Sequence, residues 1–270
     1  MFGMPPAAPR YWRYIQEILE KREKNVGLAV LNYSERYPKS KQPFQPAELI
    51  RGFHVRLALV PDGPFPTQLK QGVLAIQHLI KMGAKPENIQ ILGDSAGGTL
   101  IHEILSHMLH PVAGVPELSL SGPLGGVYMM SPWVRLVDKD REYLYSNENK
   151  GDMLSGNLLN YLGLEASRDA PKEAMPYLEP NSAPPMWLNE VDTRCVKRVL
   201  ISAGGVECLR DEIIKYQDRF KEYHQDVTFI LQANGIHNDP YWDFATYEKD
   251  LGELTPQILD WLDANCTKRD

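Results

Sequence analysis

The sequence predicts an α/β fold in which a mostly parallel sheet is covered by helices on both faces. Short apolar runs typical of buried strands alternate with amphipathic helical patterns along the chain. The 270 residues, 43% of them hydrophobic, suffice for one large domain with a substantial core. No internal repeat, low-complexity stretch or linker divides the chain, so we expect residues 1–270 to form a single domain.

The first part of the chain alternates between the two patterns. The expected elements are a helix at 11–24, a strand at 26–33, a helix at 68–82, a strand at 88–92 and a helix at 96–109. Residues 34–56 interrupt this order with three prolines, scattered charges and neither period. We expect an insertion there, either a surface loop or a gene-annotation artefact such as a translated intron.

The second part resumes the alternation after a longer irregular span. The expected elements are strands at 126–131, 198–203 and 227–231 and helices at 209–223 and 255–262. Residues 134–190 contain no clear strand and mix aromatics, methionines and prolines. We expect a cap-like excursion of helix and loop that lines an acyl or aromatic pocket, with Trp187 and Tyr161 as candidates. Ordinary connecting helices packed on the sheet remain an open alternative.

A Gly-x-Ser-x-Gly pattern stands between the strand at 88–92 and the helix at 96–109. A serine at such a turn is strained and exposes its hydroxyl, and Gly93 and Gly97 let strand and helix pass close beside it. The Ala96 N–H, at the helix N-terminus, would point at a developing oxyanion. These features predict a nucleophile at Ser95; the alternative is a capping serine in a glycine-rich helix entry.

A serine nucleophile needs a base, and the base needs an orienting acid. In hydrolases with this turn, the acid and then the histidine each follow a later strand. The strand at 198–203 leads to Glu207, and the strand at 227–231 leads to His237. Asp211 is the rival acid, but it falls one helical turn into the next helix.

These motifs resemble those of α/β-hydrolases of the hormone-sensitive-lipase-like group (alpha/beta hydrolase fold-3), particularly its fungal members. Residues 93–98 match the family elbow Gly-Asp-Ser-Ala-Gly-Gly, and residues 207–212 match the acid motif Asp/Glu-x-Leu-x-Asp-Glu. The first position of that motif is the triad acid, and His237 matches the family histidine. Pro66-Thr67-Gln68-Leu69 and Ser131-Pro132-Trp133 resemble further landmarks. The resemblance covers roughly residues 26–33 and 57–265.

The resemblance implies an α/β-hydrolase fold and a serine hydrolase of carboxylic esters of small or medium apolar molecules. The triad would be Ser95, His237 and Glu207, with the Ala96 N–H in the oxyanion hole and no cofactor. Two alternatives stay open. One is a catalytically impaired, truncated hydrolase-like protein, acting as a binding module or representing a gene-annotation fragment. The other is a lactone or thioester hydrolase of secondary metabolism.

Composition excludes several other classes. The net charge of −6 and the lack of a long basic block argue against nucleic acid as a partner. No signal pattern is present and no apolar run approaches 18 residues, so we expect a cytoplasmic protein without stable membrane insertion. The three cysteines are widely spaced, and His102, His107 and His110 do not share one helical face. Neither set predicts a metal site, and nothing indicates an oligomeric state.

The first six residues, Met-Phe-Gly-Met-Pro-Pro, look like the middle of a family landmark that follows His-Gly-Gly-Gly. In the family, that glycine run supplies the remaining oxyanion donors. The resemblance therefore implies an N-terminal truncation that removes early strands and part of the cap. It would also leave the strand at 26–33 closer to a sheet edge.

We expect the 270-residue chain to hydrolyse activated esters at least about 100-fold more slowly than a version extended upstream through His-Gly-Gly-Gly. The reason is that losing one oxyanion donor costs roughly 2.7–4 kcal/mol. Paired kinetics on p-nitrophenyl esters measure the difference. Equal turnover would mean that another local amide or side chain completes the hole.

Overall fold

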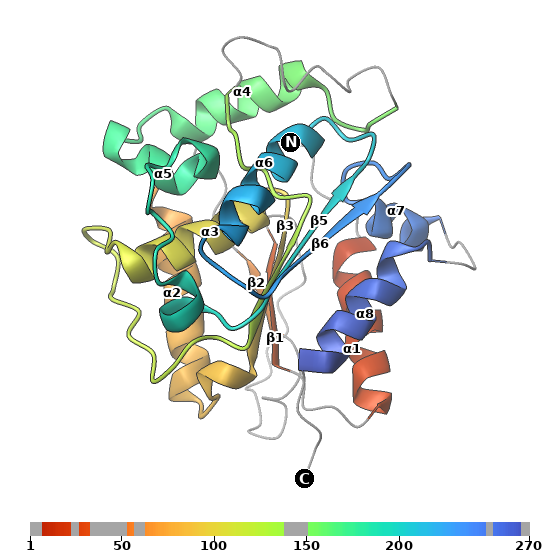
Figure 1. The fold of residues 1–270 in the computed structure, drawn as a ribbon, viewed down its shortest axis with the longest axis horizontal. Coiled ribbons are helices and arrows are strands. Elements are labelled where there is room, and N and C mark those ends of the chain that lie inside the picture. The colour runs from red at the N-terminus through yellow and green to blue at the C-terminus, as the bar shows by residue number, and fades with distance from the viewer. Residues whose placement is uncertain are drawn as a thin grey trace.

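A single parallel sheet organises the chain. The computed structural model describes residues 7–22, 27–32, 53–56, 63–137, 151–246 and 251–265. The strands are β1 (Gly27–Asn32), β2 (Phe53–Arg56), β3 (Ile89–Asp94), β4 (Gly126–Met130), β5 (Val199–Gly204) and β6 (Val227–Gln232). They form a six-stranded sheet in the order β2-β1-β3-β4-β5-β6, and every neighbouring pair is parallel. The predicted fold class is confirmed (Figure 1).

Helices cover both faces of this sheet (Figure 1). One face carries α2 (Thr67–Lys81), α3 (Ala96–Leu109) and α6 (Arg210–Lys221), and the other carries α1 (Ala7–Lys21) and α8 (Leu254–Asn265). Successive strand residues divide between two cores: Ile91 and Met129 pack on the α3 side, and Leu92 and Tyr128 on the α1 side. This is the period-two alternation that a sheet buried on both faces requires.

The N-terminal helix α1 is held by the C-terminal part of the chain. It buries Trp12, Ile15 and Leu19, the apolar positions that predicted a helix. The Trp12 Nε1 donates to the Tyr241 hydroxyl at 2.7 Å. Tyr241 belongs to α7 (Asp239–Ala245), so α1 covers the sheet only together with elements from the far end of the sequence.

Strand β2 corrects part of an expectation. The sequence predicts an aperiodic insertion over residues 34–56, yet Phe53–Arg56 form a strand that pairs with β1, with Ala29 opposite Phe53. Phe53 to Arg56 alternate apolar and polar residues, but over four residues only, which is the shortest run that indicates a strand. Because β2 lies outside β1, the strand expected closer to a sheet edge is the second strand from that edge. The rest of the expected insertion, residues 34–52, lies outside the described residues.

The irregular span contains helices and turns. Its described residues, 134–137 and 151–190, form α4 (Gly156–Ser167), α5 (Met175–Leu178) and short 3-10 turns, without a strand. Helix α4 crosses one end of the molecule (Figure 1). It packs closely on the segment after β4, because a Cβ at Gly163 would overlap the Leu136 carbonyl. Among the helices that the structure describes, none is both long and apolar enough to cross a membrane.

Glu103 of α3 should make stability depend on pH. It is 4% exposed, and burial raises its pKa from 4.5 to about 8. A raised folded-state pKa gives stability that is complete below the unfolded pKa and is lost as pH rises through the folded pKa. Relative to Glu103→Gln, the wild type should lose about 4 kcal/mol of unfolding free energy between about pH 4.5 and about pH 8.

Urea denaturation at both pH values measures this difference. Glu173→Gln, at an exposed position, is the control and should follow the wild type. Parallel pH dependence in wild type and Glu103→Gln would contradict the prediction.

Candidate active site

Ser95 lies at a strained turn between β3 and α3. Its φ is 53° and its ψ is −118°, a backbone conformation that residues with a side chain rarely adopt. A Cβ at Gly93 would overlap the Gly97 carbonyl, and a Cβ at Gly98 would lie 2.9 Å from the Pro132 Cα. The glycines of the motif are therefore required for space. The Ser95 side chain makes no capping hydrogen bond to the helix, unlike the capping serine considered as the alternative.

The segment that follows β4 braces this turn. The Ser95 N–H donates to the Met130 carbonyl at 2.9 Å, and the Ser95 carbonyl accepts from Trp133 N–H at 3.0 Å. The Thr99 hydroxyl donates to the Trp133 carbonyl at 2.5 Å. Ser131-Pro132-Trp133, which the sequence marked only as a landmark, thus fixes the position of Ser95.

The Ala96 N–H lies at the N-terminus of α3, directly after Ser95. Ala96 is the first residue of α3, and N–H groups in the first turn have no carbonyl partner within the helix. The N-terminus of a helix also carries a partial positive charge. This amide is therefore suited to bind an anionic oxygen, which is the role that the sequence predicts for it.

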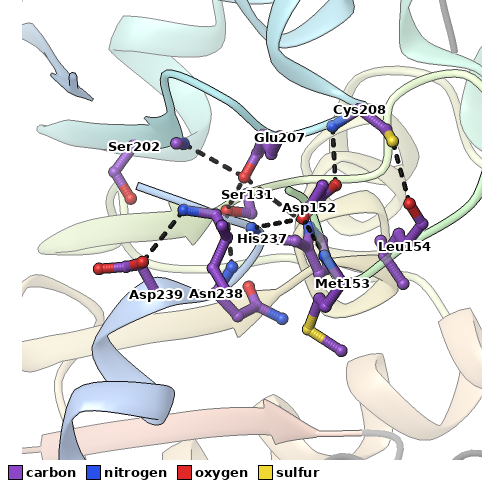
Figure 2. Close-up of polar contacts among 12 residues, drawn as sticks. Ser131, Asp152, Met153, Leu154, Ser202, Glu207, Cys208, His237, Asn238 and Asp239 are labelled. Atoms are coloured by element: carbon purple, nitrogen blue, oxygen red, sulfur yellow. Dashed lines mark hydrogen bonds and ion pairs between the residues drawn. The ribbon is translucent and has the colours of Figure 1, made fainter. Parts of the chain in front are cut away.

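Glu207 and His237 meet at the sheet edge where Ser95 lies. The three residues follow β5, β6 and β3, whose carboxyl ends share one edge because the strands are parallel. Glu207 Oε2 lies 3.8 Å from His237 Nδ1, and both side chains are buried (Figure 2). Among the described residues, no hydrogen bond joins Ser95 to His237. The structure thus pairs the predicted acid with the predicted base and places the serine at the same edge.

Backbone hydrogen bonds join the loop that carries Glu207 to the loop that carries His237. Gly205 N–H donates to the Gln232 carbonyl at 2.7 Å, and Val206 N–H donates to the Gly235 carbonyl at 3.1 Å. A Cβ at Gly204 would overlap the Gly235 carbonyl. The two loops can approach this closely because β5 ends at Gly204, which has no Cβ.

The Ser131 hydroxyl connects both loops to the end of β4. It donates to Glu207 Oε2 at 2.6 Å and accepts from Asn238 N–H at 3.2 Å (Figure 2). Gly204 N–H also donates to Glu207 Oε2, at 3.2 Å. Ser131 and Asn238 both have positive φ, 44° and 57°. Backbone strain therefore occurs at this contact as well as at Ser95.

Burial dominates the electrostatics of the pair. It raises the pKa of Glu207 to about 8, against the hydrogen bonds from Ser131 and Gly204, while Asp152 and Asp239 raise it further. Burial lowers the pKa of His237 to about 4, and the charge of Asp152 opposes this. Burial therefore keeps the imidazole of His237 neutral at neutral pH, which is the form that can accept a proton.

Asp211, the rival acid, has a different partner. It lies in the first turn of α6, and its Oδ1 accepts from Arg210 Nε at 2.7 Å. Arg210 in turn donates to the Gly205 carbonyl at 2.9 Å. Asp211 therefore supports the acid loop through Arg210, whereas Glu207 faces the histidine.

The other singled-out side chains are engaged in packing. Trp187 stacks on His110 with ring centroids 4.0 Å apart and donates to the Ser106 hydroxyl at 2.9 Å. These contacts favour the connecting-helix alternative for its segment, and Tyr161 is 60% exposed on α4. His102, His107 and His110 each bond a nearby backbone carbonyl. Within the described ranges, no three His, Cys, Asp or Glu side chains are grouped to hold a metal ion.

Sequence reasoning missed Asp152. Its carboxylate accepts from the backbone N–H groups of Cys208 at 2.8 Å and His237 at 3.0 Å (Figure 2). The residue lies in the irregular span, where no periodicity or motif singles it out. Only the fold brings it beside both loops.

The fold and the strained serine turn define an alpha/beta hydrolase. The profile of a family described as alpha/beta hydrolase fold matches residues 52–239. This match covers more than half of the chain, which therefore belongs to that family.

Named relatives are more distant. "Putative steryl acetyl hydrolase mug81" of Schizosaccharomyces pombe is 26% identical over 190 residues, which are 68% of this chain and 48% of that protein. An "Esterase" of Acinetobacter venetianus is 22% identical over 189 residues, 68% of this chain and 55% of the relative. The chain thus spans about half the length of the curated relatives it matches.

Solved structures share the fold. An esterase from the bacterial hormone-sensitive lipase family superposes with a TM-score of 0.62 and 22% identity, covering 79% of this chain and 65% of that one. An esterase/lipase from an uncultured bacterium gives a TM-score of 0.66 and 20% identity, covering 89% and 77%. The fold of this chain is that of hormone-sensitive-lipase-family esterases.

The close approach of the two loops predicts a specific cost. Gly204→Ala should lower the free energy of unfolding by roughly 1–3 kcal/mol, because its Cβ overlaps backbone atoms that no rotamer change can move. Gly122→Ala is the matched control, since a Cβ there meets nothing within 4 Å, and it should change stability by less than about 0.5 kcal/mol. Urea denaturation measures both. Equal effects would show that the loops tolerate separation.

Proposed function

We propose that this chain is a serine hydrolase that cleaves carboxylic esters of small or medium apolar molecules. The observation that carries the proposal is the strained Ser95 turn at the same sheet edge as the buried Glu207–His237 pair. The names of the two relatives, an esterase and a steryl acetyl hydrolase, support esters as the substrate class. An acetyl ester of an apolar alcohol is the first substrate to examine.

Each residue has a role in this mechanism. Ser95 Oγ attacks the ester carbonyl, and His237 Nε2 accepts its proton, because Nδ1 is the nitrogen that faces Glu207. Glu207 holds the ring in that tautomer and stabilises the imidazolium, while the Ala96 N–H donates to the oxyanion. The protonated histidine then releases the alcohol, and water repeats the sequence to free the acid. Contacts of this kind tighten in the substrate complex.

A second candidate is a hydrolase-like protein that binds an ester-like ligand without turning it over. Two observations favour it: His237 is 2% exposed, and no described hydrogen bond joins it to Ser95. A base that stays out of reach of the serine would leave the hydroxyl unactivated.

A fluorophosphonate probe separates the two candidates, because it reacts only with an activated serine. The wild type should label stoichiometrically, Ser95→Ala should not label, and Ser121→Ala, at an exposed loop serine, should label like the wild type. Intact-protein mass spectrometry reads the result. A wild type that stays unlabelled while binding an apolar ester would support the second candidate.

The choice of acid gives a further test. Glu207→Gln should lower kcat on p-nitrophenyl esters by about 10³–10⁴-fold, because the amide disturbs the histidine tautomer. Asp211→Asn should lower it by less than about tenfold, since the ion pair of Asp211 with Arg210 is partly exposed. If Asp211→Asn proves the more damaging change, the two roles are reversed.

A further inference from the structure

The Asp152 carboxylate binds three backbone N–H groups at once. Oδ1 accepts from Met153 at 2.8 Å and from His237 at 3.0 Å, and Oδ2 accepts from Cys208 at 2.8 Å (Figure 2). The first bond is local. The other two reach residues 85 and 56 positions away in the sequence. Hydrogen bonds to such distant residues are not part of a local turn.

The neighbours of Asp152 extend this contact. The Cys208 thiol donates to the Leu154 carbonyl at 3.1 Å, and Trp242 Nε1 lies 3.0 Å from the Met153 sulfur. Residues 152–154 therefore touch the acid loop at Cys208, the histidine loop at His237, and helix α7 behind it. Each contact comes from a residue of the segment that enters α4.

We propose that Asp152 is a positioning residue, whose carboxylate holds the loops of Glu207 and His237 to each other through backbone hydrogen bonds. It bonds to the backbone of His237 and makes no described bond to the ring, so it acts through the histidine and not on the substrate. The inference rests on the proposed function.

A carboxylate is the group that this position requires. Its two oxygens accept all three N–H groups, and charge-assisted bonds of this type are about twice as strong as neutral ones. An asparagine has one acceptor oxygen and would turn an NH₂ group toward an N–H donor. Asp152→Asn therefore keeps the size of the side chain while breaking the tie to at least one loop.

The charge adds a second effect. The charged side chains around the pair are Glu207 from the loop after β5, Asp152 from the segment before α4, and Asp239 from α7, which bonds Ile236 N–H at 3.0 Å. Asp152 raises the pKa of His237 against the effect of burial. Because the neutral imidazole is the active form, removing this charge should move the acid limb of the pH profile to lower pH.

Amide hydrogen exchange tests the tie independently of activity. In Asp152→Asn, peptides covering 204–210 and 234–239 should both exchange about tenfold faster or more, since each loses a charge-assisted bond. Asp169→Asn, an exposed aspartate after α4, is the control and should exchange like the wild type. Wild-type exchange in both peptides would overturn the tie.

Ester kinetics test the consequence. Asp152→Asn should lower kcat about 10- to 100-fold with KM within about threefold, and should shift the acid limb of kcat/KM about one unit lower. Asp152→Glu keeps the charge but displaces the carboxylate, so its acid limb should stay near the wild type while kcat remains low. A wild-type kcat and pH profile in Asp152→Asn would overturn the positioning role.

Ser95→Ala, measured alongside, separates this failure from that of the proposed function. Turnover that survives Ser95→Ala refutes the proposed function. Turnover that depends on Ser95 but not on Asp152 refutes the positioning role alone.

Discussion

The hydrogen bond from Ser131 to the buried Glu207 carboxylate holds the site together. A carboxylate removed from water is costly unless it is hydrogen-bonded, and Ser131 and Gly204 supply those bonds. The Ser131 hydroxyl also accepts from Asn238, and its segment braces Ser95 through Trp133. One short turn after β4 therefore fixes the position of all three predicted triad loops. The strained backbone at this turn is the cost of that convergence.

Much of this architecture could be predicted because it leaves patterns in neighbouring residues. The helices at α2, α3 and α6 follow apolar spacing, and the inner strands are short apolar runs. The glycines around Ser95 are conspicuous in the sequence because strand and helix nearly touch there. Glu207 and His237 each follow a strand of the parallel sheet. Because the carboxyl ends of parallel strands lie along one edge, the sequence could place both residues at that edge.

The remaining features depend on contacts between distant residues, which no local pattern records. Strand β2 has four alternating residues, a minimal pattern inside an irregular stretch, and its pairing with β1 is what identifies it as a strand. Asp152 resembles any other loop aspartate until the fold places two distant amides around it. Trp187 is a pocket candidate by composition, and the structure shows its ring stacked on His110. In each case the structural role follows from a contact with a residue or strand that is distant in the sequence.

The hydrogen bond between α1 and α7 has a consequence for how the protein is made. Trp12 donates to Tyr241, and Tyr241 donates to Asp94, the residue before Ser95, at 3.1 Å. Burial raises the pKa of Asp94 to about 7, so this carboxyl needs its tyrosine partner. During synthesis, Asp94 and Ser95 leave the ribosome long before Tyr241 exists. The hydrogen bonds that connect Asp94 to Tyr241 and Tyr241 to Trp12 therefore form only when the last part of the chain folds back onto the first.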